Sequence, residues 1–342
     1  MTAALMRTRD AIVGTETIRT SPAQDAALDT AARLRRMDAQ FRQAVLVSEL
    51  LEDIAFQVED YPEEGYDPPR RTARSVTVQR RAAGDGTGAA QYRPLATIIR
   101  PGVQDFAQAA PLVAAYAELR ADRAAEILVQ KEHLVPFAAA ILPITPARTP
   151  AVIEMLETGL ALVTPVVMRV KIALGCPRPS QFSDRIQPMI PEPGHPTLPS
   201  GHAMQMFTVA TMLTLLAEPA SVAVSDSQLY RLACRIAINR TVAGVHFPAD
   251  SAAGAVLGIQ LGRYLMARGQ EQAGTVGSAR FDGTRFHDRT RPRDFHSGIL
   301  ARMMAGGDPS TTFPDDAAAV RPAPLWQSLC KRAGDEWQTR WS

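Results

Sequence analysis

The sequence predicts a mainly α-helical protein, a bundle of long helices with very little sheet. Apolar residues recur every three or four positions through most of the chain, which is the pattern of helices with one buried face. Stretches that alternate apolar and polar residues, as half-buried strands do, are almost absent. Hydrophobic residues make up 46% of the 342 positions, which is enough for a sizeable core.

The N-terminal part of the chain predicts an arm, a first helix and an irregular excursion. Residues 1–22 show no helical stripe and are expected to form the arm, whereas residues 23–57 carry a stripe typical of an amphipathic helix. The stripe consists of Leu34, Met37, Phe41, Ala44, Val47, Leu51 and Ile54. Residues 59–95 contain two runs rich in glycine or proline, so we expect irregular structure there, with one short strand at 75–78.

The middle of the chain predicts two helical regions and a long loop. Helical spacing resumes over residues 105–140 and again over 150–174, where Thr149 is a candidate cap, Pro150 suits the first turn and Pro165 should kink the helix. Residues 176–199 contain seven prolines and are expected to form a loop across the surface.

Three further helices are expected over residues 200–216, 227–240 and 248–268. We therefore predict one helical domain over residues 23–268. Beyond it, residues 269–342 are rich in Gly, Arg and Pro and are expected to form a loop-rich C-terminal tail with a short amphipathic piece near its end.

Charge and hydropathy narrow the classes of function. The chain has 37 Lys and Arg against 35 Asp and Glu, so no overall field favours nucleic acid or an anionic membrane. The apolar runs 203–217 and 251–266 fall short of the roughly 18 to 20 residues that a membrane span needs. The first residues lack the pattern of a secretory signal. We therefore expect a cytoplasmic protein that binds neither membrane nor nucleic acid.

Three separated blocks carry the candidate chemistry. They combine three basic side chains, a hydroxyl, a glycine amide and two imidazoles, which are the groups that surround a tetrahedral oxyanion such as phosphate or vanadate. The blocks are Lys171, Arg178 and Pro179; Pro199, Ser200, Gly201 and His202; and Arg240, His246 and Asp250.

The context of the first two blocks favours an anion site over solvated charges. Lys171 lies in an apolar stretch, where a charge needs a counter-ion or an anionic ligand. Arg178 precedes a proline, which restricts its backbone to extended conformations. Ser200 and Gly201 stand where a helix begins after the proline-rich loop. Ser200 is suited to cap that helix, and the same free N–H groups can bind an anion, so the two interpretations are compatible.

The histidines of the second and third blocks are candidate catalytic groups. Both His202 and His246 have apolar neighbours, and a hydrogen-bonded core histidine is the simpler alternative for each. Asp250 follows His246 by four residues, so on a helix its carboxylate can orient that imidazole or pair with Arg240. An oriented imidazole can attack phosphorus or bind a metal oxyanion.

Together the three blocks resemble the tripartite signature of the vanadium-dependent haloperoxidases and the type 2 phosphatidic acid phosphatase superfamily, which includes bacterial acid phosphatases. The resemblance covers about 80 residues and implies a helical bundle. It implies that Lys171, Arg178 and Arg240 neutralise the oxyanion while Ser200 and the Gly201 amide donate hydrogen bonds. His246 would be the covalent partner, hence the vanadium ligand in a haloperoxidase, and His202 the acid–base residue on the opposite side.

Phosphate and vanadate have similar shapes, so the signature leaves two chemistries open. His195, five residues before Ser200, resembles the additional histidine of the bromoperoxidases, although a surface loop histidine is the simpler interpretation. On this residue we predict a haloperoxidase with vanadate as cofactor, which oxidises bromide or iodide with hydrogen peroxide. Met168 matches neither the chloroperoxidase nor the algal bromoperoxidase pattern, which makes chloride oxidation less favoured.

The alternative is a soluble acid phosphatase that hydrolyses phosphomonoesters through a phosphohistidine at His246. Asn239 stands where the superfamily often has serine, a peripheral departure. A small organic acceptor and a homo-oligomer are both compatible with the sequence.

Overall fold

The computed structural model describes residues 3, 4, 8, 29–62, 71–84, 90–220, 227–272, 274–287 and 292–341. The chain divides into two compact units, Met1–Arg36 and Met37–Ser342. In the first unit, helix α2 (Thr30–Arg35) begins after Asp29, whose side chain accepts a hydrogen bond from the amide of Ala32. All that follows concerns the second unit.

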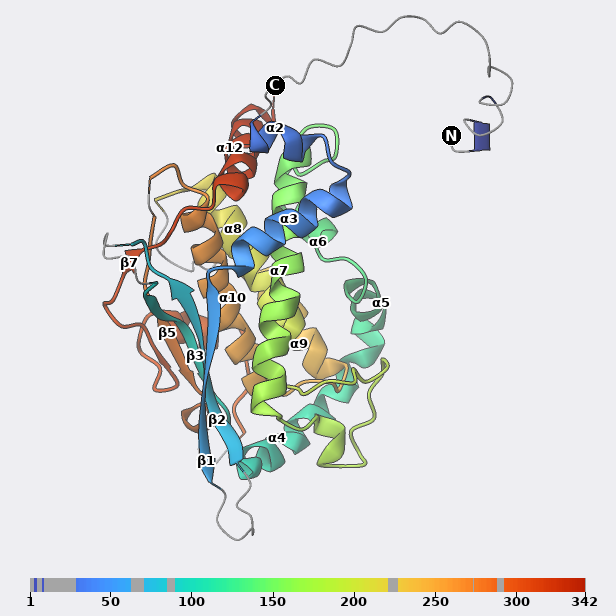
Figure 1. The fold of residues 1–342 in the computed structure, drawn as a ribbon. Helices are drawn as coiled ribbons and strands as arrows, with labels where there is room; N and C mark the ends of the chain where they lie inside the picture. Colours follow the sequence, from blue (N-terminus) through green and yellow to red (C-terminus); the bar gives the residue numbers. More distant parts are fainter. Residues whose placement is uncertain are drawn as a thin grey trace, which may run out of the picture. The chain divides into compact units, whose positions relative to one another are not determined.

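Four helices form the centre of the second unit. They are α7 (Pro150–Leu174), α8 (Gly201–Ala217), α9 (Gln228–Val242) and α10 (Pro248–Arg268). Figure 1 shows α7 alongside α8 and α10, with α9 behind them. Helix α10 is buried along almost its whole length and packs on α8, because its glycines permit close contact. A Cβ at Gly254 would lie 2.6 Å from the carbonyl oxygen of Ser200.

These helices follow the sequence predictions closely. The bounds of α7 and α10 match the predicted ranges, and α8 and α9 differ by one or two residues at their ends. Pro150 occupies the first turn of α7 after Thr149. Ser200 caps α8, since its hydroxyl oxygen accepts a hydrogen bond from the amide of Ala203. The proline-rich segment 176–199 contains only the short helix η2 (Pro179–Gln181).

Further helices surround the central four. They are α3 (Ala39–Leu51), α4 (Val103–Ala115), η1 (Tyr116–Leu119), α5 (Arg120–Gln130), α6 (Val135–Ala139), α11 (Ser297–Met304) and α12 (Pro324–Thr339). The predicted single helix over 23–57 is wrong, because the backbone is extended at Asp38 and the chain enters a strand at Ile54. The helical region 105–140 is divided into four pieces.

A five-stranded sheet corrects the prediction of almost no strand. Its order is β1 (Ile54–Pro62), β2 (Arg71–Arg81), β3 (Tyr92–Ile99), β5 (Ala279–Asp282) and β6 (Thr311–Thr312). Strands β1, β2 and β3 form an antiparallel meander within the segment expected to be irregular. The expected short strand at 75–78 lies inside β2, whose arginines hid its strand pattern. A separate pair joins β4 (Thr275–Val276) to β7 (Ala318–Ala319).

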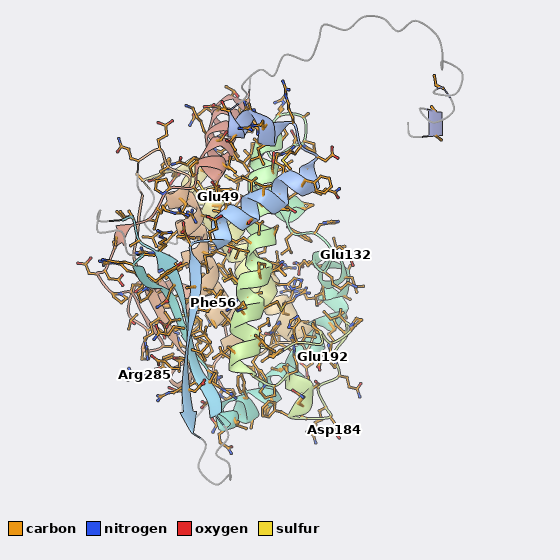
Figure 2. The ribbon with its side chains drawn as sticks, viewed as in Figure 1. Glu49, Phe56, Glu132, Asp184, Glu192 and Arg285 are labelled. Atoms are coloured by element: carbon orange, nitrogen blue, oxygen red, sulfur yellow. The ribbon has the colours of Figure 1, made fainter. Side chains whose placement is uncertain are left out.

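The sheet lies against the helices through α7 and α10. In Figure 1 the strands β1, β2 and β3 run along one side of α7. Phe56 of β1 is labelled beside this helix in Figure 2, and the guanidinium carbon of Arg169 lies 4.6 Å from the centre of its ring. This contact ties the meander to α7 near the end that carries Lys171.

The C-terminal segment is more ordered than the predicted loop-rich tail. Strand β5 pairs in parallel with β3, and β6 extends the same sheet. Helix α12 packs on α7, and the indole N–H of its buried Trp326 donates to the carbonyl oxygen of Leu265 at 2.8 Å. Trp337 is buried as well, whereas Trp341 is exposed. The predicted domain boundaries stay predictions.

Among the described residues, one helical stretch has the length and composition of a membrane span. It covers Pro150–Gln181, and 56% of its most apolar window is buried inside the protein. The core helix of a globular protein passes the same test. Neither of the apolar runs considered in the sequence meets the criterion. The cytoplasmic location and the absence of membrane contact stay predictions.

Candidate oxyanion site

The predicted site residues meet at one end of the helical centre. Lys171 comes from the last turns of α7, and Arg178 and His195 come from the loop that follows. The N-terminus of α8 supplies the second block, the end of α9 supplies Arg240, and His246 lies just before α10. Five segments thus converge although the blocks are separated in the sequence.

His246 is held by Asp250 in the orientation that a nucleophile needs. Its Nδ1 lies 3.0 Å from a carboxylate oxygen of Asp250. A carboxylate only accepts hydrogen bonds, so Nδ1 carries the proton and Nε2 keeps its lone pair. Nε2 lies 3.4 Å from a terminal nitrogen of Arg178, which donates to it. The carboxylate of Asp250 bonds to Thr197, His246 and the amide of Phe247, so its role is to orient His246 and not to pair with Arg240.

Thr197 completes this arrangement and was missed in the sequence. Its hydroxyl donates to the same carboxylate oxygen of Asp250 at 2.5 Å, and its oxygen lies 3.0 Å from Nδ1 of His246. The amide of Phe247 donates to that oxygen as well, at 2.8 Å. Burial raises the pKa of Asp250 to about 6, although these hydrogen bonds oppose the rise. Burial lowers the pKa of His246, and the nearby Lys171 and Arg178 lower it further, so its imidazole is neutral.

Arg178 and His195 form one unit. The guanidinium Nε donates to the carbonyl oxygen of His195 at 3.0 Å, and a terminal nitrogen lies 3.0 Å from Nδ1 of the same residue. The other terminal nitrogen donates to the carbonyl oxygen of Val245 at 2.7 Å. Nδ1 of His195 also lies 3.1 Å from the carbonyl oxygen of Pro196, so it accepts from Arg178 in one tautomer and donates to that carbonyl in the other. His195 thus lies at the site, and the surface-loop interpretation does not describe its position.

Lys171 is completely buried and binds the loop from beneath. Its ammonium group donates to the carbonyl oxygens of Pro196 and Thr197 at 2.8 and 2.7 Å. An ammonium group has three protons, so one remains for a ligand. Burial, reinforced by the charge of Arg178, lowers the pKa of Lys171 to about 7. An oxyanion would favour the charged form.

Arg240 offers the strongest indication that the site is suited to an anion. It is buried, with 1% of its surface exposed, and one terminal nitrogen donates to Gln130 Oε1 at 3.0 Å and to the carbonyl oxygen of Ile127 at 3.3 Å. Its Nε and the other terminal nitrogen are buried without any hydrogen-bond partner. A buried guanidinium with free donors is costly, and an oxyanion would satisfy it.

The start of α8 adds neutral donors to this basic environment. The first N–H groups of a helix have no carbonyl within the helix to bind, and the helix dipole favours negative charge there. Gly201 has open space where a side chain would begin, so its backbone can be approached closely. Ser200 is buried, and its hydroxyl proton remains available because its oxygen acts as the acceptor for Ala203.

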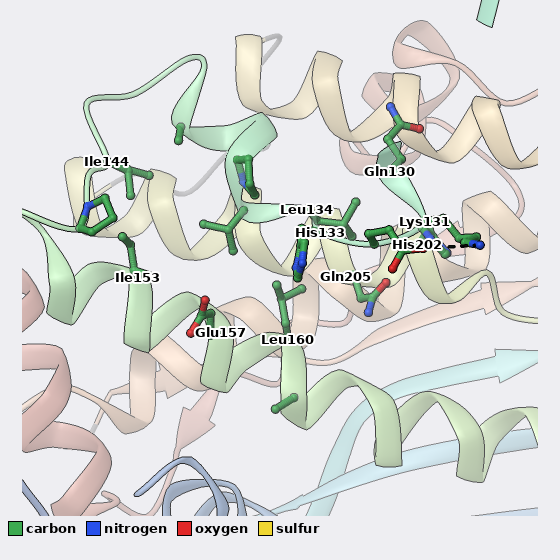
Figure 3. Close-up of a pocket in the computed structure, with 16 residues that line it drawn as sticks. Gln130, Lys131, His133, Leu134, Ile144, Ile153, Glu157, Leu160, His202 and Gln205 are labelled. Carbon is green, nitrogen blue, oxygen red and sulfur yellow. Dashed lines mark ion pairs between the residues drawn. The ribbon is translucent and has the colours of Figure 1, made fainter. Parts of the chain in front are cut away.

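His202 stands between the oxyanion site and a pocket of about 630 Å³. Its ring makes a hydrogen bond with the backbone carbonyl of Gln130, and burial together with the charge of Arg240 lowers its pKa to about 3. Figure 3 shows His202 and Gln205 of α8 at one part of the pocket and Leu160 of α7 along its wall. The remaining wall is mostly apolar and includes Leu134, Val135, Pro136, Ile144 and Ile153.

Taken together, these residues fit a tetrahedral oxyanion of the phosphate or vanadate type. The positive charges of Lys171, Arg178 and Arg240 balance an anion, Arg240 has donors without partners, and the Nε2 lone pair of His246 is available for phosphorus or vanadium. The fold and the site thus define a mostly helical protein whose buried basic side chains could hold an oxyanion.

Comparison with known proteins agrees with this class. Residues 154–272 match the family model described as the PAP2 superfamily, so this segment is a PAP2 superfamily domain. The match includes all three blocks and excludes α5, the sheet meander and α12. No curated protein matches the chain.

A solved structure also shows local similarity. It is described as the crystal structure of the first transmembrane PAP2 type phosphatidylglycerolphosphate phosphatase from Bacillus subtilis. The two chains are 18% identical, and the alignment covers 44% of this chain and 88% of the other, with a TM-score of 0.26. No property of this protein follows from this likeness.

Proposed function

We propose that this protein is a phosphoesterase of the PAP2 type, which hydrolyses phosphomonoesters through a phosphohistidine at His246. The observation that carries the proposal is the His246–Asp250 pair in one site with the buried Arg240 donors that have no hydrogen-bond partner. His246 presents an unprotonated Nε2 held by Asp250, and His202 faces a pocket large enough for an organic leaving group. The PAP2 superfamily match supports this class of enzyme.

The first step transfers the phosphoryl group. Nε2 of His246 attacks phosphorus, the bond from phosphorus to the ester oxygen breaks, and His202 gives its proton to the departing alcohol. His202 has a low pKa in the free protein, and the charge of a bound phosphate would raise that pKa towards the value that a proton donor needs. Arg240 and Lys171 would stabilise the charge that develops on the equatorial oxygens.

The second step returns the free enzyme. His202, now neutral, takes a proton from a water molecule whose oxygen attacks phosphorus, and the bond from phosphorus to His246 breaks. Inorganic phosphate then leaves. The apolar lining of the pocket favours an ester whose alcohol portion is apolar, because burial of that surface contributes about 25 cal/mol per Å².

Side-by-side assays test the proposal. Purified protein should hydrolyse p-nitrophenyl phosphate and alkyl phosphates without any added metal, and orthovanadate should inhibit competitively because it occupies the same site. In parallel, protein with orthovanadate, hydrogen peroxide and bromide should leave a halogen-accepting dye unchanged. Bromination of the dye without any ester hydrolysis would overturn the assignment and favour the second candidate.

The second candidate is a vanadium-dependent haloperoxidase that oxidises bromide or iodide. The observation that favours it is His195, which lies against Arg178 at the edge of the site. Bound through His246, vanadate would activate hydrogen peroxide toward halide. In this chain Arg178, Arg240 and Lys171 would hold its oxygens, and His202 would exchange protons with the peroxide. A His195→Ala variant would then lose bromination and retain vanadate binding.

Oxyanion binding should depend on pH through Lys171. Sulfate is a suitable probe because it is tetrahedral and keeps its charge over the range studied. The pKa of Lys171 is about 7 in the free protein, and sulfate binds the charged form, so the contribution of Lys171 to the affinity should be complete well below pH 7 and be lost above it. The expected loss is roughly tenfold per pH unit above 7.

Calorimetric titration with sulfate from pH 5.5 to 9 measures this dependence. A Lys171→Met variant should bind weakly at every pH and lose the transition near 7, retaining only the smaller effect of Asp250 ionisation near 6. If the wild-type affinity is the same at pH 6 and pH 9, Lys171 does not contribute its charge to the site.

A further inference from the structure

The inference concerns Gln130, the last residue of α5, which lies outside the segment that matches the PAP2 superfamily. Its side chain is completely buried, and it lines the pocket beside His202. It therefore stands where the pocket, the acid–base histidine and Arg240 meet. None of the three sequence blocks includes it.

The amide of Gln130 is fixed between an anion and a cation. Its Nε2 donates to Glu126 Oε1 at 2.7 Å, and its Oε1 accepts from Arg240 at 3.0 Å. Glutamate only accepts and arginine only donates, so only one orientation of the amide satisfies both. Asn239 Nδ2 donates to the same Oε1 at 3.0 Å and to Glu126 at 2.9 Å, which supports that orientation from α9.

This fixed amide determines which part of the Arg240 guanidinium faces the ligand. One terminal nitrogen of Arg240 is occupied by Gln130 Oε1 and the carbonyl oxygen of Ile127. The Nε and the other terminal nitrogen are left without partners and remain available to a ligand. The same residue binds His202 through its backbone carbonyl. Gln130 thus contacts two of the groups that the proposed reaction uses.

We propose that Gln130 is a positioning residue for the oxyanion, which acts through Arg240 and is itself held by Glu126. The proposal rests on the proposed phosphoesterase function. Glu126 is anchored in turn by Arg235, whose Nε donates to both carboxylate oxygens at 2.9 Å, while Arg123 binds Asn239 at 3.1 Å. Helix α5 therefore takes part in the site although it supplies no group to the reacting atoms.

The hydrogen bonds from Arg235, Gln130 and Asn239 act on the ionisation of Glu126. Burial raises the pKa of Glu126, but these hydrogen bonds lower it by more, so the pKa lies below its ordinary value. The carboxylate consequently stays charged and accepting at neutral pH. Buried hydrogen bonds to charged groups stabilise their arrangement more than neutral ones, so this network is suited to keep Arg240 in one rotamer.

The test compares two buried glutamines. Gln130→Met keeps the length of the side chain and the backbone carbonyl to His202, but removes the bond to Arg240. Gln260→Met is the matched control, because Gln260 is also buried and donates to the carbonyl oxygen of Gly277 far from the site. Both variants should lose thermal stability. Only Gln130→Met should weaken binding of inorganic phosphate, by about tenfold in a calorimetric titration.

The kinetic readout separates positioning from a structural role. For p-nitrophenyl phosphate, Gln130→Met should raise KM by about the same factor as the phosphate Kd, and the shape of the pH profile should not change, because His202 keeps its backbone partner. Equal phosphate affinity in the Gln130→Met, Gln260→Met and wild-type proteins would show that Gln130 only supports the fold, and would overturn the proposal.

A second variant covers the case in which Gln130→Met does not fold. Glu126 is partly exposed, and Glu126→Leu releases the Gln130 amide while the hydrogen-bond partners of Arg240 stay in place. Phosphate affinity should decrease about threefold, since the amide keeps its bond to Arg240 but can rotate. No decrease would contradict the proposal. Phosphate binding is measured without turnover, so a protein that binds phosphate through Gln130 but hydrolyses no ester would refute the function and leave the positioning role standing.

Discussion

Replacement of His246 by alanine is expected to lower kcat for phosphomonoesters by at least about 10³-fold. The reason is that Nε2 of His246 is the group that would bond to phosphorus, and removal of a nucleophile leaves only binding and charge stabilisation by the remaining residues. The measurement is steady-state turnover of p-nitrophenyl phosphate, with rapid acid-free quenching to detect the phosphohistidine in the wild-type protein.

A matched control comes from the same residue type. His296 is exposed, caps α11 by accepting from the amide of Gly298, and lies outside the site, so His296→Ala should keep full turnover. Because His246→Ala leaves the Asp250 carboxylate without its imidazole partner, thermal unfolding should be recorded for each variant. A folded His246→Ala protein with wild-type kcat would sink the assignment of the site.

Replacement of His202 by alanine should cause the second large loss of turnover, and the size of this loss should depend on the leaving group. Proton transfer by a positioned side chain typically contributes about 10²- to 10⁴-fold. An alkoxide needs that proton, whereas p-nitrophenolate leaves without it. We therefore expect a loss of about 10³-fold for an alkyl phosphate and a much smaller loss for p-nitrophenyl phosphate.

The comparison needs both esters in the wild-type and His202→Ala proteins. Oxyanion affinity should change little in the variant, because Arg240 and the α8 amides remain in place; inorganic phosphate inhibition measures this. Equal losses for the two esters would mean that His202 does not protonate the leaving group, and its role would then be limited to binding.

The sequence was sufficient for the helices that carry the site. Local signals mark α7 and α10 at both ends: Pro150 and Pro248 stand in the first turns, and Gly175 and Gly269 follow the last residues. These prolines and glycines can be recognised from the sequence because each is favoured by the backbone conformation at its own end of a helix. The sequence also predicted that Lys171 and His246 share one site. The resemblance to a known family indicates which distant residues lie together, and helical periodicity does not.

The sheet could not be predicted in the same way. Strand β2 alternates imperfectly, since Ser75, Val76, Thr77 and Val78 are all buried although successive residues point to opposite faces of the sheet. A strand with both faces covered lacks the alternating pattern that sequence analysis detects. The short β5 has four residues, and its pairing with β3 depends on a distant part of the chain.

The supporting residues of the site were missed for a similar reason. Thr197 lies in the proline-rich loop, three residues before Ser200. Threonine is common in loops, so nothing in the sequence indicated a role for it in the site. Gln130 lies 41 positions before Lys171 and belongs to no block. Their roles follow only from the contacts to Asp250 and Arg240, which the folded chain creates.

The parallel pairing of β3 with β5 has a consequence for how this protein is made. Residues 96–99 pair with residues 279–282, so the ribosome must synthesise the whole oxyanion site before the sheet can close. Until then the hydrogen-bonding edge of β3 stays open, and such an edge can pair with other chains. Contacts between distant residues also slow folding. The nascent chain therefore exposes this edge of β3 until residues 279–282 have been made.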